Sequence, residues 1–225
     1  MMALKKVYSG YTEKSMKNLL LDSGAYFKNF EIGTDTFESA VDAGKLIGAT
    51  QGGGQFVAKG VFRQIEFDGV LGKAKGADVL EAWEVSIQAN VKEITTETLA
   101  LALGLSYIDT TTNATYNIVT GKNHVEEEDY IDNITWVGTL SGSDEPVIIQ
   151  VYNAFNTEGL TLDVKPKSEA VISMKFEGRY DATDLDTPPF NIYYPKAEAT
   201  TPIDPEDPED PEDPEDPEDP EDPEE

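Results

Sequence analysis

The chain has 225 residues, enough for one domain with or without an appendage. It contains no cysteine, which excludes disulfide frameworks, thiolate zinc sites and cysteine nucleophiles. The formal net charge is −27, and 15 of the 44 acidic residues fall in residues 202–225, where there is no Lys or Arg. Residues 1–201 therefore carry 29 acidic and 17 basic side chains, a net charge of −12. This balance argues against tight nucleic-acid binding, which needs Lys and Arg to displace counterions from phosphates.

The N-terminal third gives weak local signals. Residues 1–6 are not followed by an apolar segment, and the longest apolar runs, such as residues 99–103, are too short to span a bilayer. We therefore expect neither a secretion signal nor a membrane partner. Residues 14–21 predict a short helix. Residues 35–54 have little periodicity and many turn-forming residues, so we expect a long loop with little structure of its own.

A glycine-rich turn precedes the central strands, and its residues are Gln51, Gly52, Gly53 and Gly54. It lacks the Gly-Lys-Ser/Thr that completes a phosphate-binding loop, so we interpret it as a source of unusual backbone angles. Strands are predicted at residues 55–58 and 63–67. A tight turn follows at Asp68, and residues 70–78 form a loop with two further glycines.

Residues 79–94 give the clearest strand signal, because apolar and polar side chains alternate. Trp83, Val85, Ile87, Ala89 and Val91 fall on one face, and Glu84, Ser86, Gln88, Asn90 and Lys92 on the other. This period of two predicts that one face packs on a core while the other meets solvent or a polar channel. We interpret Trp83 and Trp136 as core residues, with an interface role for one of them left open.

A helix is predicted at residues 97–103. Thr95 or Thr96 can cap its N-terminus, Gly104 can end it, and Leu99 and Leu103 would cover the β-structure. Further strands are predicted at residues 131–140, 147–155, 160–165 and 170–180. We expect a hairpin turn at Glu158 between the second and third of these.

Together these elements predict a mainly β fold, an antiparallel β-sandwich or barrel with one flanking α-helix and long extended loops. Residues 1–201 would form one domain with an N-terminal arm. Residues 202–225 repeat Asp-Pro-Glu seven times, which predicts a disordered acidic tail. Docking of that tail on a partner is the alternative.

Residues that could carry chemistry are few. His124 is the only histidine, which excludes a histidine metal cluster, and Ser141 and Ser143 lack a nucleophile-elbow pattern. Residues 181–186 hold three aspartates that could bind calcium, but they lack EF-hand spacing, and we favour a solvated turn. We therefore expect no enzymatic activity, no cofactor and no metal site.

Several short motifs recur in an order that resembles a known family. They are Gly48-Ala49-Thr50-Gln51-Gly52-Gly53-Gly54-Gln55-Phe56, Arg63-Gln64-Ile65-Glu66-Phe67-Asp68-Gly69, Gly72-Lys73-Ala74-Lys75-Gly76, Glu81-Ala82-Trp83-Glu84 and Glu93-Ile94-Thr95-Thr96-Glu97-Thr98-Leu99. Their order and spacing resemble the major tail (tail tube) proteins of long-tailed bacteriophages of Gram-positive bacteria. The close match covers about a quarter of the chain.

This resemblance implies a structural protein that polymerises into stacked, hexameric rings and forms a phage tail tube. Its partners would be itself, the tape-measure protein and the tail terminator protein. DNA would pass through an acidic lumen without specific binding. The protein would be assembled in the host cytoplasm and reside in the virion tail.

The resemblance also suggests roles for single residues. Gln51, Gly52, Gly53, Gly54, Arg63 and Asp68 would lie at subunit interfaces, and Glu84, Glu93 and Glu177 would line the lumen. The glycines would be either a flexible turn or a hinge that lets residues 35–54 reach a neighbouring subunit. Two alternative functions stay open: a monomeric, calcium-assisted β-sandwich that binds at a surface, and a hydrolase with a carboxylate pair, which only the abundance of Asp and Glu supports.

Overall fold

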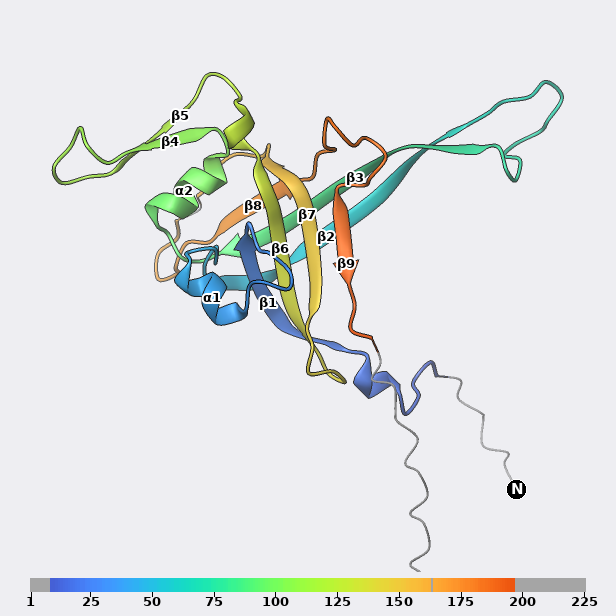
Figure 1. The fold of residues 1–225 in the computed structure, drawn as a ribbon, viewed down its shortest axis with the longest axis horizontal. Helices are drawn as coiled ribbons and strands as arrows, with labels where there is room; N and C mark the ends of the chain where they lie inside the picture. The colour runs from blue at the N-terminus through green and yellow to red at the C-terminus, as the bar shows by residue number, and fades with distance from the viewer. Residues whose placement is uncertain (1–8, 163, 197–225) are drawn as a thin grey trace, which may run out of the picture. The chain divides into compact units, whose positions relative to one another are not determined.

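The computed structural model describes residues 9–162 and 164–196, so the predicted acidic tail lies outside the described residues. Seven strands form one antiparallel sheet in the order β1-β6-β7-β8-β3-β2, with β9 pairing beside β7 (Figure 1). Their bounds are β1 Leu20–Lys28, β2 Thr50–Gln64, β3 Asp78–Val91, β6 Ile131–Leu140, β7 Val147–Asn156, β8 Ile172–Glu177 and β9 Phe190–Tyr193. The prediction of a mainly β, antiparallel fold is confirmed.

Smaller elements flank this sheet. Strands β4 (Ser106–Asp109) and β5 (Ile118–Gly121) form a separate hairpin, and helices α1 (Phe37–Asp42) and α2 (Thr96–Leu103) lie beside the sheet. Two 3₁₀ turns span Ser15–Lys17 and Glu127–Asp129. Among the described residues, no helix has the length and apolar character needed to cross a membrane.

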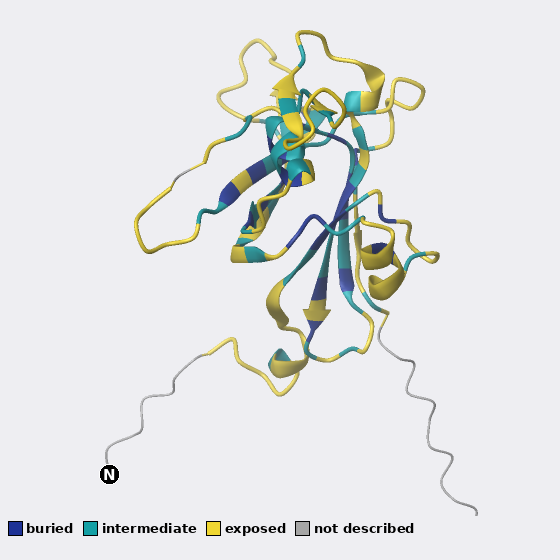
Figure 2. Cartoon of the chain, turned by 90° about the vertical axis from the view of Figure 1, so that its left-hand side faces the viewer, coloured by how far each residue is buried: buried dark blue, intermediate teal, exposed yellow. Residues whose placement is uncertain are grey.

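Strand β7 joins two halves of the sheet that share one core. Most of β7 pairs with β6, but its last two residues, Phe155 and Asn156, pair with β8. Side chains from both halves meet in the core, including Ile134 and Val151 from one half and Ile87 and Phe176 from the other, all at most 1% exposed. Figure 2 shows the buried stretches of the strands in dark blue. Burying a large apolar side chain contributes roughly 1.5–3 kcal/mol, so this shared core holds the halves together.

The strand predictions hold where alternation is regular. On β3, Val85, Ile87, Ala89 and Val91 are buried, whereas Glu84 is exposed. Strand β6 has the predicted bounds, and β8, which buries Ile172, Met174 and Phe176, lies within the predicted segment 170–180 but is shorter.

Two strand predictions need correction. The described residues of the segment predicted as a strand, 160–162 and 164–165, lie in no strand, and Leu162 makes only an isolated bridge to Ile172. The hairpin therefore connects β7 to β8, because Asn156 already pairs with Phe176. Residues 55–58 and 63–67 were predicted as separate strands, but β2 runs without interruption from Thr50 to Gln64 and then ends.

The predicted helix at residues 14–21 is also wrong. Only Ser15–Lys17 forms a 3₁₀ turn, and the chain enters β1 at Leu20. Asp22 and Gly24 adopt φ angles of 64° and 66°, which bulge β1 and interrupt its alternation. Long-range pairing of Ala25–Lys28 with β6 fixes this strand, and local sequence does not report such pairing.

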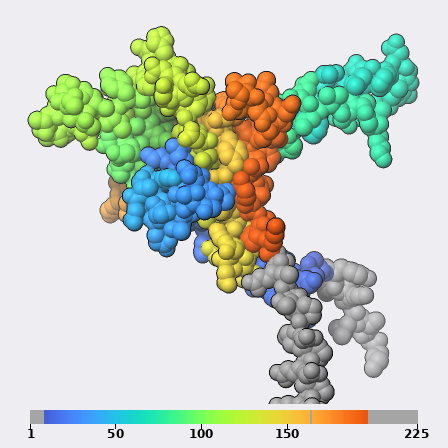
Figure 3. All heavy atoms as spheres, in the orientation of Figure 1, coloured from blue at the N-terminus to red at the C-terminus, as the bar shows by residue number. Residues whose placement is uncertain are grey.

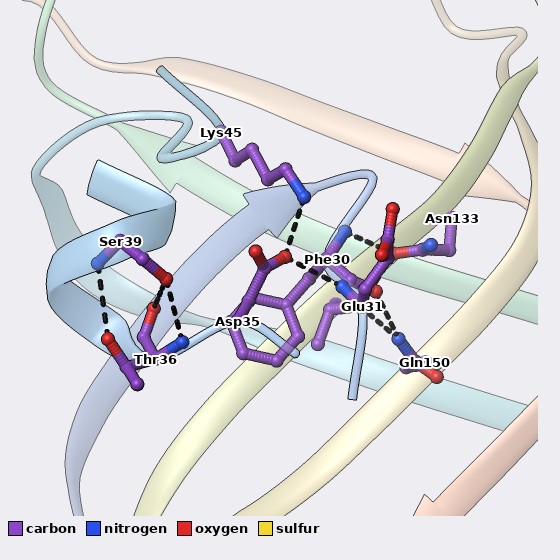
Figure 4. Close-up of polar contacts among 9 residues, drawn as sticks. Phe30, Glu31, Asp35, Thr36, Ser39, Lys45, Asn133 and Gln150 are labelled. Carbon is purple, nitrogen blue, oxygen red and sulfur yellow. Dashed lines mark hydrogen bonds and ion pairs between the residues drawn. The ribbon is translucent and has the colours of Figure 1, made fainter. Parts of the chain in front are cut away.

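Residues 35–54 contain more structure than predicted. Thr36 caps α1, since its hydroxyl accepts from the Ser39 amide at 3.2 Å and the Ser39 hydroxyl accepts from the Thr36 amide at 2.8 Å (Figure 4). Ala40 of α1 is fully buried against Phe27 and Phe30. A six-residue helix spans too few turns to show periodicity, which explains the error.

Helix α2 begins and ends as predicted. Thr95 caps its N-terminus, and Gly104 ends it with a φ of 75°. The buried positions are Thr98 and Ala102, and Leu99 packs against the core. Leu103 does not join that core. The face of α2 that packs on the sheet is therefore offset by about one residue from the face predicted from Leu99 and Leu103.

Candidate functional site

The half-sheet β8-β3-β2 has one apolar face in the core and one polar face outside it. On the polar face, Lys59 stands directly across from Glu84, and their Nζ and Oε2 atoms are 3.0 Å apart. The Gln88 amide nitrogen donates to the Ser173 hydroxyl at 2.8 Å. This face therefore carries cross-strand polar pairs.

The basic residues of this half-sheet are all engaged. Within the described strands β2, β3 and β8 the only Lys and Arg are Lys59, Arg63 and Lys175. Arg63 pairs with Glu81 at 2.8 Å and Lys175 with Glu158 at 2.9 Å. The hydrogen bond to Glu158 raises the pKa of Lys175, because it stabilises the charged ammonium form. No cation of these strands is left without a carboxylate.

Two of the three predicted lumen residues lie together. Glu177 of β8 stands across from Ser86 of β3, and Glu84 is two residues before Ser86, so both carboxylates are on the polar face. Glu177 accepts from Arg179 at 2.9 Å. Glu93 lies beyond the end of β3, where its Oε1 accepts from the Ala49 amide at 3.0 Å. Glu93 therefore holds the backbone that precedes β2 and does not share that face.

The glycine run forms a bulge inside β2 instead of a turn before it. Thr50 pairs with Val91 and Gly54 with Ala89, so residues 51–53 span a single two-residue step of β3. Gly52 and Gly53 reach φ angles of 84° and 70°, which favour glycine. The Gly53 carbonyl accepts from Asn90 at 3.1 Å, which ties this bulge to β3.

The predicted interface residues fall into two separate places. The glycine run lies in the body beside β1, because a Cβ on Gly54 would overlap the Tyr26 hydroxyl. Arg63 lies near the far end of β2, and Asp68 lies in the turn beyond it, where Gly69 has a φ of 82°. The predicted turn at Asp68 is confirmed.

The far end of the β2–β3 hairpin carries apolar side chains that sequence reasoning missed. Beyond a bulge at Val61 and Phe62 the hairpin leaves the body and projects into solvent (Figures 1 and 3). Its exposed large apolar residues are Phe62, Ile65, Phe67, Val70, Leu71 and Leu80. Exposed apolar side chains that gather in one place are a common feature of interaction surfaces, so this end of the hairpin is a candidate surface. The signal in the sequence was the apolar pair Val70-Leu71 inside a glycine-rich loop.

Free strand edges form another candidate surface. Among the described residues, β2 pairs only with β3, and residues 173–175 of β8 pair only with β3, whereas Ile172 also bridges Leu162. The half-sheet thus has an unpaired edge on each side along part of its length. Exposed edges offer backbone donors and acceptors to another chain.

Among the described residues, the contacts of the remaining sequence candidates are structural and bring together no binding or catalytic site. Asp181 accepts from the Thr183 amide and hydroxyl, both at 2.7 Å, so its carboxylate closes its own turn. Among the described residues, no group of three or more His, Asp or Glu is placed to hold a metal ion. Trp83 packs against Phe190 with ring centroids 5.5 Å apart, and the Trp136 indole donates to the Ser23 carbonyl at 2.8 Å. His124 is exposed.

Neither a protein-family model nor a curated protein sequence significantly matches this chain.

Proposed function

We propose that this protein is the subunit of a phage tail tube, a structural protein that polymerises into stacked rings around a channel for DNA. The observation that carries the proposal is the half-sheet β8-β3-β2, which has one core face, one polar face and, on each side, an edge that is unpaired along part of its length. The ordered motifs of residues 48–99 support the same conclusion through their resemblance to tail tube proteins.

A ring follows from joining these edges. When the β2 edge of one copy meets the β8 edge of the next, the half-sheet continues from copy to copy along the unpaired part of β8. Every polar face then turns to the same side. Closure with this face inward produces a polar lumen, and hexameric closure is what the family resemblance implies.

The charges of the polar face suit a conduit for DNA. Lys59, Arg63 and Lys175 are all held by carboxylates, so phosphates would find no free cation on these strands. Binding of DNA depends on such cations, and their neutralisation lets the duplex slide. In this proposal Glu84 and Glu177 face the lumen, and each helps to hold a neighbouring cation in place.

Stacking of rings completes the tube. A head-to-tail contact between unlike surfaces does not close on a pair of copies, so it produces an open filament. Tape-measure and tail terminator proteins would be further partners, and the assembled protein would belong to the virion tail after assembly in the host cytoplasm.

Electron microscopy of the purified protein at high concentration, with and without seeding by native tails, tests the proposal. We expect hollow tubes or stacked rings. A matched pair of cysteine variants, Val57→Cys on β2 and Ser173→Cys on β8, should cross-link between copies within these particles. Uniform monomers under all conditions would overturn the proposal. Stabilisation of such monomers by millimolar calcium would then favour a surface-binding module.

A further inference from the structure

The β2–β3 hairpin ends in a pre-formed apolar tip, which we define as residues 65–77. The Ile65 amide donates to the Ala77 carbonyl at 2.8 Å, which closes the base of the tip, and Ala77 is buried. Leu71 is fully exposed, at 101%, beside the half-exposed Val70.

An apolar pocket lies on a different part of the body, between the α1 segment and the turn from β6 to β7. Its cavity volume is about 460 Å³, and its apolar lining comprises Phe27, Phe30, Ile32, Phe37, Val137 and Ile148. Ile32 and Phe37 are 39% and 54% exposed, so the pocket is open to solvent. We call it the α1 pocket.

Hydrogen bonds from the sheet hold the wall of the α1 pocket in place (Figure 4). The Phe30 amide donates to Asn133 at 3.0 Å, and the Phe30 carbonyl accepts from Gln150 at 2.8 Å. Asp35 accepts from the Glu31 amide at 2.8 Å and pairs with Lys45 at 2.6 Å. The pocket is therefore a fixed feature of the fold, as ligand pockets generally are.

Charge matches the tip to the α1 pocket. At the apex of the tip, residues 69–77 carry Lys73 and Lys75 and no acidic residue, whereas Glu66 and Asp68 nearer the base make residues 65–77 neutral overall. At the pocket, Asp35 is engaged by Lys45, but Glu145 forms no ion pair with any described residue. The apex of the tip and the margin of the α1 pocket thus carry opposite charges, which favours this pairing over contacts between like surfaces.

Geometry excludes docking of the tip on its own chain. In Figure 1 the hairpin projects to the upper right, away from α1, which lies at the lower left of the body. We propose that the hairpin tip of one copy docks in the α1 pocket of a second copy, with Val70 and Leu71 in the pocket and Lys73 and Lys75 near Glu145. This deepens the proposed function, on which it rests, because the contact joins unlike surfaces and extends without closing on a pair.

Cysteine cross-linking tests the contact directly, since the chain has no cysteine of its own. Protein with Leu71→Cys is mixed at assembly concentration with protein carrying Ile32→Cys, and a short bismaleimide is added. We expect at least fivefold more mixed dimer than with Thr112→Cys, an exposed control position between β4 and β5. Unfolding curves of each variant verify that the fold is intact.

A charge reversal provides the second arm. Lys73→Glu with Lys75→Glu should lower the cross-linking yield at least fivefold, and Glu145→Lys in the pocket-bearing copy should restore it. Lys165→Glu with Lys167→Glu, on the loop between β7 and β8, should change nothing. Particles that assemble while the Leu71–Ile32 yield stays at the control level would overturn the docking and leave the tube standing. Specific cross-linking without any tube would keep the docking and overturn the tube.

Discussion

The Cα atom of Gly54 in β2 lies against the phenol hydroxyl of Tyr26 in β1, at the place where the two halves of the sheet approach each other. Burial of Tyr26 between these strands raises the pKa of its hydroxyl. A Cβ at position 54 would overlap both this hydroxyl and the Gln88 carbonyl oxygen, and the latter belongs to rigid strand backbone. Only glycine fits here without a shift of β2 from β1 or β3.

Gly54→Ala should therefore destabilise the fold by about 2 kcal/mol, the usual cost of overpacking a well-packed site. Urea unfolding followed by tryptophan fluorescence measures this change. Gly121→Ala in β5 is the matched control, because its new Cβ would meet only the Leu105 carbonyl at an ordinary distance of 3.7 Å. Equal midpoints for wild type and Gly54→Ala would contradict the packing described for this site.

Phe190→Ala should loosen the attachment of β9. The Phe190 ring packs on Trp83 at 5.5 Å and on Phe56 at 5.9 Å between centroids, so it joins β9 to the β2–β3 half. Because the ring is only half-buried, we expect a loss of about 2 kcal/mol, below the ~3–5 kcal/mol of a fully buried Phe.

Ile192→Ala, on the same strand but 53% exposed, should change the free energy of unfolding by no more than about 0.5 kcal/mol. Thermal unfolding with tryptophan fluorescence reports both variants, since Trp83 contacts the deleted ring. A loss for Ile192→Ala as large as that for Phe190→Ala would show that β9 is not anchored through this aromatic cluster.

Asp35 should make the α1 segment sensitive to acid. The Glu31 amide and then the Lys45 ammonium hydrogen-bond its carboxylate and lower its pKa below the ordinary 3.8. A depressed folded-state pKa contributes stability above the unfolded-state pKa, and this stability disappears as the pH falls through the folded-state value. The stability difference between wild type and Asp35→Asn should thus be constant above pH ~5 and should shrink below pH ~4.

Melting temperatures of the two proteins at intervals between pH 7 and pH 2 measure this difference. Asp132→Asn is the control, because Asp132 is exposed on β6 and its carboxylate makes no hydrogen bond within the described residues. A wild-type advantage that grows on acidification would reverse the sign and refute the role of Asp35.

How far the sequence predicts this fold depends on the range of the interactions that form each element. Strands β3 and β6 and helix α2 follow from local signals, namely regular alternation and the Thr95 and Gly104 caps. Strand β1 does not, because the positive φ of Asp22 breaks its alternation and only pairing with β6 defines it. Helix α1 is fixed by the burial of Ala40 against residues distant in the sequence. The pattern of its six residues does not predict that contact.

The residues of the candidate site also separate into those that local alternation places and those that it does not. Glu84 was placed on the polar face of β3 by alternation alone, and Glu177 joins it there through β8. Glu93 could not be placed by that rule, since β3 ends at Val91 and the carboxylate turns to the Ala49 amide. The projecting tip was missed because residues 65–77 lie beyond the end of β2, where strand alternation no longer indicates which side chains are exposed, and because the bulge at Phe62 leaves no regular signature in sequence.

Reversal of the lumen charges should convert a DNA-repelling tube into a DNA-retaining one, if the polar face lines the channel as proposed. Glu84→Lys with Glu177→Lys removes two carboxylates and leaves Lys59 and Arg179 without their partners, so phosphates gain several free cations. Assembled tubes of this variant should retain short double-stranded DNA on sedimentation at low salt and release it at about 0.5 M salt, where screening is strong. Tubes of Glu127→Lys with Glu128→Lys, in the exposed 3₁₀ turn, carry the same change in net charge and control for binding outside the channel. Equal retention by the two variants would show that the β8-β3-β2 face does not surround the DNA path.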